Sequence, residues 1–345
     1  MNTPWRVFLE NALCATESPM RGEGTGFCGL PGYGLLRVSG EDAENFLQGQ
    51  LTADVKALLP GRGGFGALCT PKGRVISSFH LLRSDRLYYF LLPADLSETV
   101  RTRLQTYVLR SRVTLENLTP ERGFLGLLGS GPESFAGDEG LAFPDTPGTW
   151  LDEADTLAFR LDDGSKRCLI AAPTARAVEI WSRLSRGNSL VDSEAWRLAD
   201  IKAGLPEVVP GTTGEFLPQM LNLDVLGGIG FQKGCYTGQE IVTRTHYLGQ
   251  IKRRMFHLRC RTESAPYPGT PVFDAFETEP LHAGMVVLAA RADSENFDLL
   301  AVLGIESSRR GRLRVFRPDG PPAEVLPLPY SVDLPRGQQP EAQKD

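Results

Sequence analysis

The sequence predicts an α+β protein made of two related units and a small β-barrel. Residues 34–118 contain strand and helix patterns in the order βαβββαβ. A weaker copy of this pattern follows over residues 124–184. From Ile251 to Tyr330 the chain changes to short strands separated by turns, which is typical of a small barrel. Because hairpins join antiparallel strands, we expect mostly antiparallel sheets rather than a parallel doubly wound sheet.

The first unit shows clear element signals. Residues 34–40 alternate apolar and polar side chains, as a half-buried strand does, and residues 41–51 place four apolar side chains on one helical stripe. Residues 65–82 predict a hairpin around Thr70–Gly73, since proline and glycine occupy turn positions. The remaining elements are a strand, a helix and a strand at residues 86–93, 94–108 and 111–118.

The second unit is predicted from an internal echo. Residues 124–135 resemble residues 35–46, and residues 166–184 resemble residues 86–104, with strand, proline and helix in the same places. Two copies of one unit explain this echo, but a chance similarity between strand–helix segments explains it equally well. We divide the chain into four parts. The first unit covers residues 25–118, and the second unit, which carries the motif KGCYTGQE, covers residues 119–245. A C-terminal barrel at residues 246–333 and a flexible tail at residues 334–345 follow.

Composition limits the functional class. The 345 residues are 41% apolar and 23% charged, with a net charge of −5, so nothing global favours nucleic-acid or membrane binding. No apolar run reaches the roughly 18 residues of a membrane span. The N-terminal segment lacks the basic-then-apolar layout of a secretion signal. We therefore expect a cytoplasmic protein without a membrane partner.

The cysteines and histidines show no metal-binding pattern. Six cysteines are scattered along the chain without a CxxC pair, which excludes zinc-ribbon and thioredoxin-type spacings. The four histidines also lack the spacing of metal ligands. We predict no metal site and read the unpaired thiols as reduced.

Two helix starts carry capping side chains. Ser193 is predicted to cap a helix that ends at Gly204. Thr237, with Glu240 three residues later, forms a capping-box pattern, so that a second helix should run from about Gly238.

The segment FQKGCYTGQEIVTR, residues 231–244, places a thiol close to this second start. Cys235 lies two residues before the expected helix, where unpaired N–H groups carry partial positive charge. Lys233 adds a formal charge nearby, so both features favour the thiolate. Gly234 and Gly238 would let the backbone approach a ligand closely. The ordinary alternative is a buried structural cysteine with Lys233 in water, and the residues alone leave both open.

The motif KGCYTGQE, residues 233–240, resembles the signature of the YgfZ family, K-G-C-Y-x-G-Q-E, at every fixed position. The family consists of folate-binding proteins related to the glycine-cleavage T-protein, an aminomethyltransferase. The segment upstream of the motif and four others are also similar to the family, so the likeness covers most of residues 30–305. These segments are residues 216–232, 37–55, 69–83, 107–113 and 197–206.

The resemblance implies an architecture and a role. Two ferredoxin-like α+β units and a C-terminal β-barrel would surround a central cavity that holds tetrahydrofolate. Members of the family act in the assembly or repair of iron–sulfur proteins and are linked to tRNA thiomodification. Cys235 would then be the working thiol, assisted by Lys233, and iron–sulfur proteins or their assembly machinery would be the partners. The sequence leaves open whether the protein touches tRNA.

The folate site is predicted from the polar and aromatic residues around the motif. Folate requires a flat apolar slot, a few aimed polar groups and cations for its glutamate tail. We assign tetrahydrofolate, or a one-carbon derivative of it, to five residues: Gln219, Asn222, Tyr236, Glu240 and Arg244.

One strand separates the chain from the T-protein. Ser77 and Ser78 stand where the T-protein has two acidic residues. A serine cannot supply a carboxylate, so we expect the aminomethyltransferase activity to be lost although the fold is kept. The alternatives are a folate-dependent one-carbon transferase of the T-protein type and a non-catalytic folate-sensing module.

Overall fold

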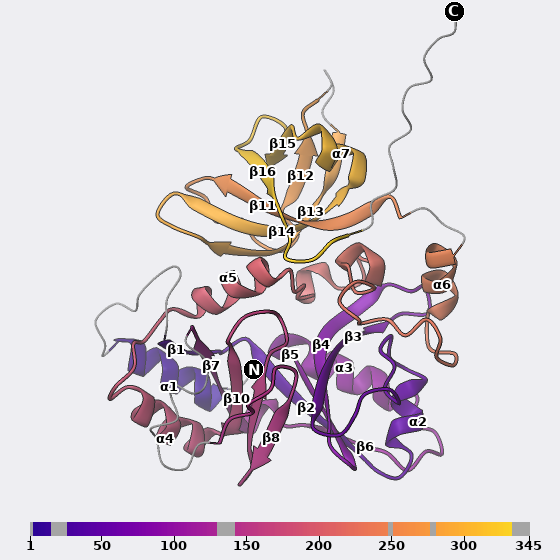
Figure 1. Ribbon diagram of the computed structural model, residues 1–345, viewed down its shortest axis with the longest axis vertical. Coiled ribbons are helices and arrows are strands. Elements are labelled where there is room, and N and C mark those ends of the chain that lie inside the picture. The colour runs from indigo at the N-terminus through magenta and orange to yellow at the C-terminus, as the bar shows by residue number, and fades with distance from the viewer. Residues whose placement is uncertain (1–2, 15–25, 130–141, 248–250, 277–280, 333–345) are drawn as a thin grey trace, which may run out of the picture.

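The computed structural model describes residues 3–14, 26–129, 142–247, 251–276 and 281–332, and the predicted tail at 334–345 lies outside them. Two five-stranded sheets lie on one side of the molecule and a closed barrel on the other, with helix α5 (Ser193–Ala203) between them (Figure 1). Within the described ranges no helix is long and apolar enough to cross a membrane.

The first unit has the predicted order βαβββαβ. Its sheet has the strand order β3-β4-β5-β2-β6, and every pair is antiparallel. The predicted turn is present, because the Gly73 N–H donates to the carbonyl of Thr70 and Gly73 has a φ of 69°. The elements are β2 (Tyr33–Ser39), α2 (Ala43–Gln48), β3 (Arg62–Cys69), β4 (Val75–Arg83), β5 (Leu87–Pro93), α3 (Ala94–Gln105) and β6 (Thr114–Asn117).

The second sheet repeats the first, which confirms the duplicated fold. Its order is β8-β9-β10-β7-β1, so β1 takes the edge place that β6 has in the first sheet. In each unit a proline stands directly before the long helix, at Pro93 in the first unit and at Pro173 in the second. The elements are β1 (Gly26–Gly29), β7 (Arg122–Leu128), β8 (Trp150–Glu153), β9 (Thr156–Arg160), β10 (Cys168–Pro173) and α4 (Thr174–Leu184).

The N-terminal helix α1 (Thr3–Cys14) was not predicted. It packs on the second unit through Trp5 and Leu9, which are 0% and 4% exposed. The ring of Trp5 meets that of Trp181 on α4 edge to face, at 6.3 Å between centroids. Tertiary packing, rather than a strong helical pattern, therefore stabilises this helix.

The C-terminal region is a closed barrel, as the late change to short strands predicts. The strand order is β11-β14-β13-β12-β15-β16, and β16 pairs back onto β11. The elements are β11 (Arg253–Arg261), β12 (Pro271–Asp274), β13 (Leu281–Arg291), β14 (Asn296–Gly304), the short helix α7 (Ile305–Arg310), β15 (Leu313–Val315) and β16 (Pro322–Leu326).

Helix α5 and the segment after it seat the barrel on the sheets. One apolar cluster includes Val75 of β4, Ile201 of α5 and Val302 of β14, so it spans all three parts. The helix ends at Gly204 as predicted, in the left-handed conformation with a φ of 67°. Its N-cap is Asp192, whose carboxylate accepts from the N–H of Glu194, so the prediction of Ser193 was wrong by one residue.

A buried ion pair ties the barrel to the 3₁₀ turn at Pro218–Leu221 (η4) and the residues after it. Arg254, which is 3% exposed, donates to both carboxylate oxygens of Asp224 at 2.6 and 2.8 Å. The same guanidinium donates to the carbonyl of Gln219 at 2.9 Å. A bidentate, charge-assisted contact of this kind fixes both position and orientation.

Arg254→Ala is expected to lower the free energy of unfolding by about 3–5 kcal/mol, because it leaves the Asp224 carboxylate enclosed without its partner. Arg253→Ala is the matched control, since Arg253 is the exposed neighbour on the same strand. Its effect should stay within about 0.5 kcal/mol. Denaturation followed by circular dichroism measures both, and equal losses for the two variants would contradict the role of the pair.

Candidate functional site

The loop that carries Cys235 is anchored on the first unit. The ammonium of Lys233 donates to the carbonyls of Leu51 and Ala53 at 2.8 and 2.7 Å. It also lies 4.9 Å from the centroid of the Tyr236 ring, in cation–π contact. Burial lowers the pKa of Lys233 to about 8. The ammonium is thus engaged by backbone carbonyls and an aromatic ring, and its hydrogen bonds hold the loop.

The helix after the loop, α6 (Gln239–Tyr247), begins later than predicted. The carbonyl of Gly238 accepts from the N–H of Val242, which makes Gly238 the N-cap. The hydroxyl of Thr237 instead donates to the side chain of Gln50 in the first unit at 3.2 Å. The predicted capping box of Thr237 and Glu240 was therefore wrong, because a tertiary partner takes the threonine. Glu240 is exposed.

Cys235 is exposed on this loop, four residues before α6 begins. Cys14 at the end of α1 is also exposed, whereas the other four cysteines are buried. Burial raises the pKa of Cys69 and Cys168 to about 12 and that of Cys260 to about 11, and it raises that of Cys28 still further. Two thiols, and not one, are therefore accessible for reaction.

The residues assigned to folate are divided between the interior and the surface. Gln219 and Asn222 are fully buried, and their amide groups donate to the carbonyls of Val242 on α6 and Met255 on β11. They fix η4 between these two elements. Their side-chain oxygens have no hydrogen-bond partner among the residues that the structure describes. Tyr236 is 7% exposed, and burial raises its pKa.

Arg244 is exposed on α6. None of the seven predicted site residues is among those that line the connected pockets described next. Their roles in catalysis or folate binding stay predictions.

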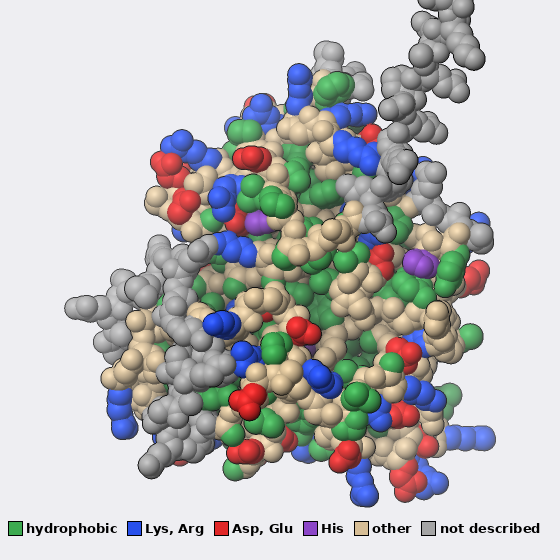
Figure 2. All heavy atoms as spheres, viewed as in Figure 1, with side chains coloured by type: hydrophobic (Ala, Val, Ile, Leu, Met, Phe, Trp, Pro, Cys, Tyr) green, Lys and Arg blue, Asp and Glu red, His purple; other side chains and the backbone are tan. Residues whose placement is uncertain are grey.

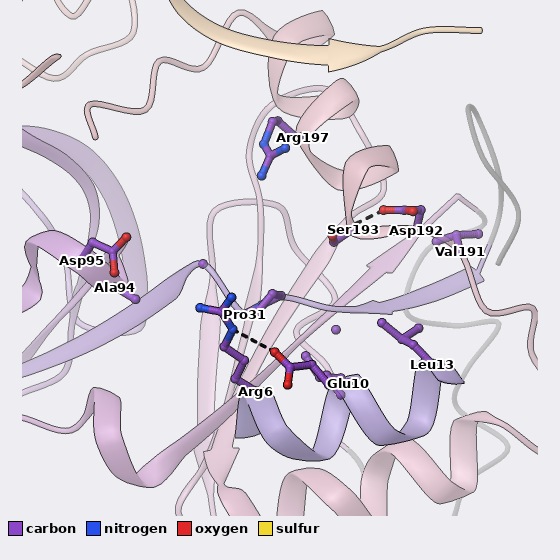
Figure 3. A pocket seen from close by; sticks show the side chains of 13 residues that line it. Arg6, Glu10, Leu13, Pro31, Ala94, Asp95, Val191, Asp192, Ser193 and Arg197 are labelled. Atoms are coloured by element: carbon purple, nitrogen blue, oxygen red, sulfur yellow. Dashed lines mark hydrogen bonds and ion pairs between the residues drawn. The ribbon is translucent and has the colours of Figure 1, made fainter. Parts of the chain in front are cut away.

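A cavity runs from the surface toward the first sheet. Its outer part, about 400 Å³, lies between α1, Gly29–Gly32, the start of α3 and the start of α5. Figure 3 shows Arg197 of α5 and the Arg6–Glu10 pair of α1 on opposite sides of it. Two smaller pockets of about 60 and 30 Å³ lie next to it, further inward.

Shared lining residues show that the three pockets adjoin one another. The outer and middle pockets share Pro31, Gly32, Ser193 and Arg197. The middle and inner pockets share Tyr33, Asp200 and Glu207. The inner end reaches Phe65 and His80 on β3 and β4.

The wall of the cavity is an aromatic pair held by a buried cation. The indole N–H of Trp196 donates to the hydroxyl of Tyr33 at 3.0 Å, and the two rings meet edge to face. The guanidinium of Arg167 lies 4.6 Å from the Trp196 ring and donates to Asp200 at 2.8 Å. It also pairs with Asp163. These contacts fix the aromatic wall before any ligand enters.

Ser77 and Ser78, which were predicted to stand where the T-protein has acidic residues, hold the backbone. Ser78 donates to the carbonyl of Pro206 at 3.0 Å and accepts from the N–H of Val208 at 3.2 Å. Ser77 is fully buried and donates to the carbonyl of Ser78. Ser78 thus fixes residues 206–208, which we call the strap. This contact holds Glu207 at the cavity.

Glu207 and His80 are the titratable groups at the inner end. Burial, together with the nearby carboxylate of Asp200, raises the pKa of Glu207 to about 7, and Arg197 opposes the shift. Burial lowers the pKa of His80 to about 4, so its imidazole is neutral at pH 7. Both side chains are half-buried, because the protein encloses them except where they face the cavity.

Sequence reasoning missed the residues of this cavity: Tyr33, Trp196, Arg197, Asp200 and Glu207. One signal was available, since Trp196 and Asp200 are four residues apart and therefore share a face of the predicted helix. Nothing local indicated that this face would meet Tyr33 and the strap. Within the described ranges, no group of three or more histidine, cysteine or acidic residues could hold a metal ion.

Comparison with known proteins finds relatives over nearly the whole chain. The chain is 30% identical over 308 residues to the tRNA-modifying protein YgfZ of Photorhabdus laumondii, covering 88% of this chain and 92% of the relative. It is also 30% identical over 304 residues to the protein of the same name in Klebsiella pneumoniae, with the same coverage. No protein-family model matches the chain.

A solved structure shares the fold. The glycine cleavage system aminomethyltransferase T from Bartonella henselae superposes with a TM-score of 0.74 at 18% sequence identity. The superposition covers 89% of this chain and 86% of that one. The predicted T-protein-like architecture is therefore confirmed.

Gly238→Ala is expected to destabilise the thiol loop by at least about 1–2 kcal/mol, because Gly238 has a φ of 84°. A Cβ there would also lie 2.5 Å from the Thr70 carbonyl oxygen. Gly234→Ala is the matched control, since a Cβ at Gly234 meets nothing within 4 Å. Thermal unfolding and the alkylation rate of Cys235 report the effect. Indistinguishable behaviour of the two variants would show that the loop does not depend on this turn.

Brief iodoacetamide treatment near neutral pH should modify Cys235 and Cys14 at least about ten times faster than the four buried cysteines, whose thiolate forms are disfavoured. Peptide mass spectrometry gives the six rates. A Cys14→Ser variant isolates the signal of Cys235. If Cys235 then reacts as slowly as Cys69, its thiol is not available to a partner.

Proposed function

The chain belongs to the YgfZ family, and from this premise we propose that it binds a tetrahydrofolate in the cavity beside α5 and acts as an accessory factor for iron–sulfur proteins. Cys235 is its working thiol. The relatives are named tRNA-modifying proteins, so we place the role in the maintenance of enzymes that modify tRNA.

The observation that carries the folate proposal is the cavity itself. Its outer volume of about 400 Å³ falls within the range of small-molecule sites. Tyr33 and Trp196 offer aromatic surface to a flat ring. Glu207 offers acceptors to ring N–H groups, and Arg197 near the mouth offers a cation to the glutamate tail. The residues present therefore fit the chemistry of a folate.

The thiol is proposed to work outside the folate cavity. Cys235 is exposed on a loop whose backbone is held by Lys233 and by hydrogen bonds between Thr52 and residues 228–230. An accessible thiol on an anchored loop can reach a second macromolecule without closing the folate site. This arrangement suits a nucleophile or a transient ligand that acts on a partner protein.

The partner is proposed to be a protein and not the tRNA. On the face drawn in Figure 2, basic and acidic side chains are interspersed over the sheets and the barrel. A protein that grips RNA ordinarily shows a basic stripe. The chain as a whole has a net charge of −5, which also does not favour direct RNA binding.

One observation favours a second candidate, a folate-dependent one-carbon transferase. Ser77 and Ser78 supply no carboxylate, but Glu207 brings one to the same cavity from the strap that Ser78 holds. Ammonia release from an aminomethylated carrier protein with tetrahydrofolate, above the rate without enzyme, would support transfer chemistry. The accessory role predicts no such release.

A calorimetric titration with tetrahydrofolate triglutamate tests the binding proposal. Affinity should fall as salt rises, because screening weakens the attraction between the tail and cations. Arg197→Ala should weaken binding about two- to fivefold and flatten this salt dependence. Arg253→Ala on the barrel, outside the cavity, should behave as wild type. Absence of binding by the wild type would refute the proposal.

Cys235→Ala separates the thiol from the folate site. Its folate affinity should match that of the wild type, because Cys235 does not line the cavity. For the same reason, saturating folate should not protect Cys235 from iodoacetamide. In cells that lack the native protein, the variant should fail to restore iron–sulfur enzyme activity. Full restoration would favour a folate-sensing module with a structural cysteine.

A further inference from the structure

The end of the barrel that carries α7 and β15 is rich in arginine and points away from the two sheets (Figure 1). Five arginines lie within nine residues there: Arg309, Arg310, Arg312, Arg314 and Arg317. We propose that Arg312, Arg314 and the exposed ring of Phe276, together called the arginine patch, form a docking surface for an acidic segment of a partner protein. The patch lies outside the three adjoining pockets and the thiol loop, so this inference goes beyond the proposed folate site.

The register of β15 turns two of these arginines outward. Leu313 and Val315 are 1% and 0% exposed and belong to the barrel core. Because side chains alternate along a strand, Arg314 between them lies on the outer face of the barrel. The carbonyl of Arg312, just before β15, accepts from the N–H of Ala275 and continues the pairing with β12. Both arginines therefore stand on the same outer face.

Phe276, which follows β12, holds cations beside this face. It is 49% exposed. The guanidinium carbons of Arg310 and Arg312 lie 5.2 and 5.3 Å from the centroid of its ring, in cation–π contact. The ring thus restricts the side chain of Arg312 before a partner arrives, so less conformational entropy is lost on binding.

Carboxylates of the protein neutralise some of the five arginines but not all of them. Ion pairs join Arg309 to Glu306, Arg310 to Asp274 and Arg317 to Asp319. Within the described residues, neither Arg312 nor Arg314 has a carboxylate oxygen within 4.0 Å, and Arg314 donates instead to the carbonyl of Gly320. The arginine patch therefore presents two positive charges that no ion pair neutralises in the described part of the chain.

A carboxylate is the group that these charges fit. Each guanidinium is a planar fork that can donate to both oxygens of one carboxylate in parallel. A short run of aspartate and glutamate around an apolar residue would pair with Arg312 and Arg314 and place the apolar side chain against Phe276. Arginine and aromatic residues are also the types enriched at protein–protein interfaces.

The size of the arginine patch favours protein over RNA. A protein that binds nucleic acid through its phosphates makes on the order of 6–10 such contacts, and the patch offers two unpaired cations. A stacked base would also need the face of the Phe276 ring, over which the guanidinium groups of Arg310 and Arg312 already lie. We therefore argue for an acidic protein segment, and RNA binding is one outcome of the test.

Fluorescence anisotropy tests the arginine patch with two labelled peptides. The first consists of aspartate, glutamate and leucine, and the second has asparagine and glutamine in place of the acids. Wild type should bind the acidic peptide at least about tenfold more tightly than the amide peptide, because only the acids complement the charges of the patch. This affinity should fall about three- to tenfold when salt rises from about 50 to 300 mM, since screening weakens exposed ion pairs.

Arg312→Glu combined with Arg314→Glu should weaken binding of the acidic peptide at least about tenfold, because like charges then face each other. Lys56→Glu combined with Arg86→Glu is the matched control, since it makes the same change in net charge at two exposed residues of the first unit. The control should bind as wild type does. Phe276→Ala should weaken binding about two- to fivefold, because Arg312 loses its cation–π contact and leucine loses its apolar surface.

Thermal unfolding of each variant should stay close to that of wild type, since all the substituted side chains are exposed or half-buried. If wild type does not bind the acidic peptide, or if the two double variants lose affinity equally, the inference is overturned. Unfractionated tRNA is titrated in parallel. If tRNA binds more tightly than the acidic peptide and loses affinity when Arg312 and Arg314 are reversed in charge, the surface is an RNA site and the proposed protein partner is wrong.

Discussion

Arg167 places a guanidinium that is 1% exposed between the carboxylates of Asp163 and Asp200 and against the ring of Trp196. It joins the second unit to α5, and through Trp196 it reaches Tyr33 of the first unit. A buried charge is tolerated only when its partners are well placed, so this arrangement constrains every element that supplies one. The cavity lies along this network, and its shape depends on the positions that the paired charges of Arg167, Asp163 and Asp200 require.

The pockets and the thiol loop lie on different parts of the first unit. The acidic and aromatic groups gather on one side of β3 and β4, whereas the thiol loop packs on other parts of the first unit through Lys233 and Thr237. Phe65 of β3 lines the inner pocket, while its carbonyl lies close to Gly228 at the start of the loop segment. The first sheet thus borders both the inner pocket and the segment that carries the thiol.

Local sequence signals identified elements whose cause is local. The turn at Thr70–Gly73 and the end of α5 at Gly204 follow from backbone conformations that glycine adopts readily. Thr237 failed as a predicted cap because its hydroxyl found Gln50, about 190 residues away in the sequence. The cavity residues were not predicted for a similar reason. Trp196 and Glu207 line a common cavity only when α5, β2 and the strap come together in the fold. The family motif indicated the fold correctly and pointed to the thiol, but the motif does not line the cavity.

The place of β1 has a consequence for synthesis of the chain. This strand pairs with β7 at residues 122–128, and its other edge meets residues 189–191. Helix α1 likewise packs on α4 and lines the mouth of the cavity. Helix α1 and β1 therefore find their packing partners only in segments that are translated much later, at residues 122–128, 174–184 and 189–191. The first unit can collapse early, whereas the outer pocket is completed late, when α1 and β1 dock on these later segments.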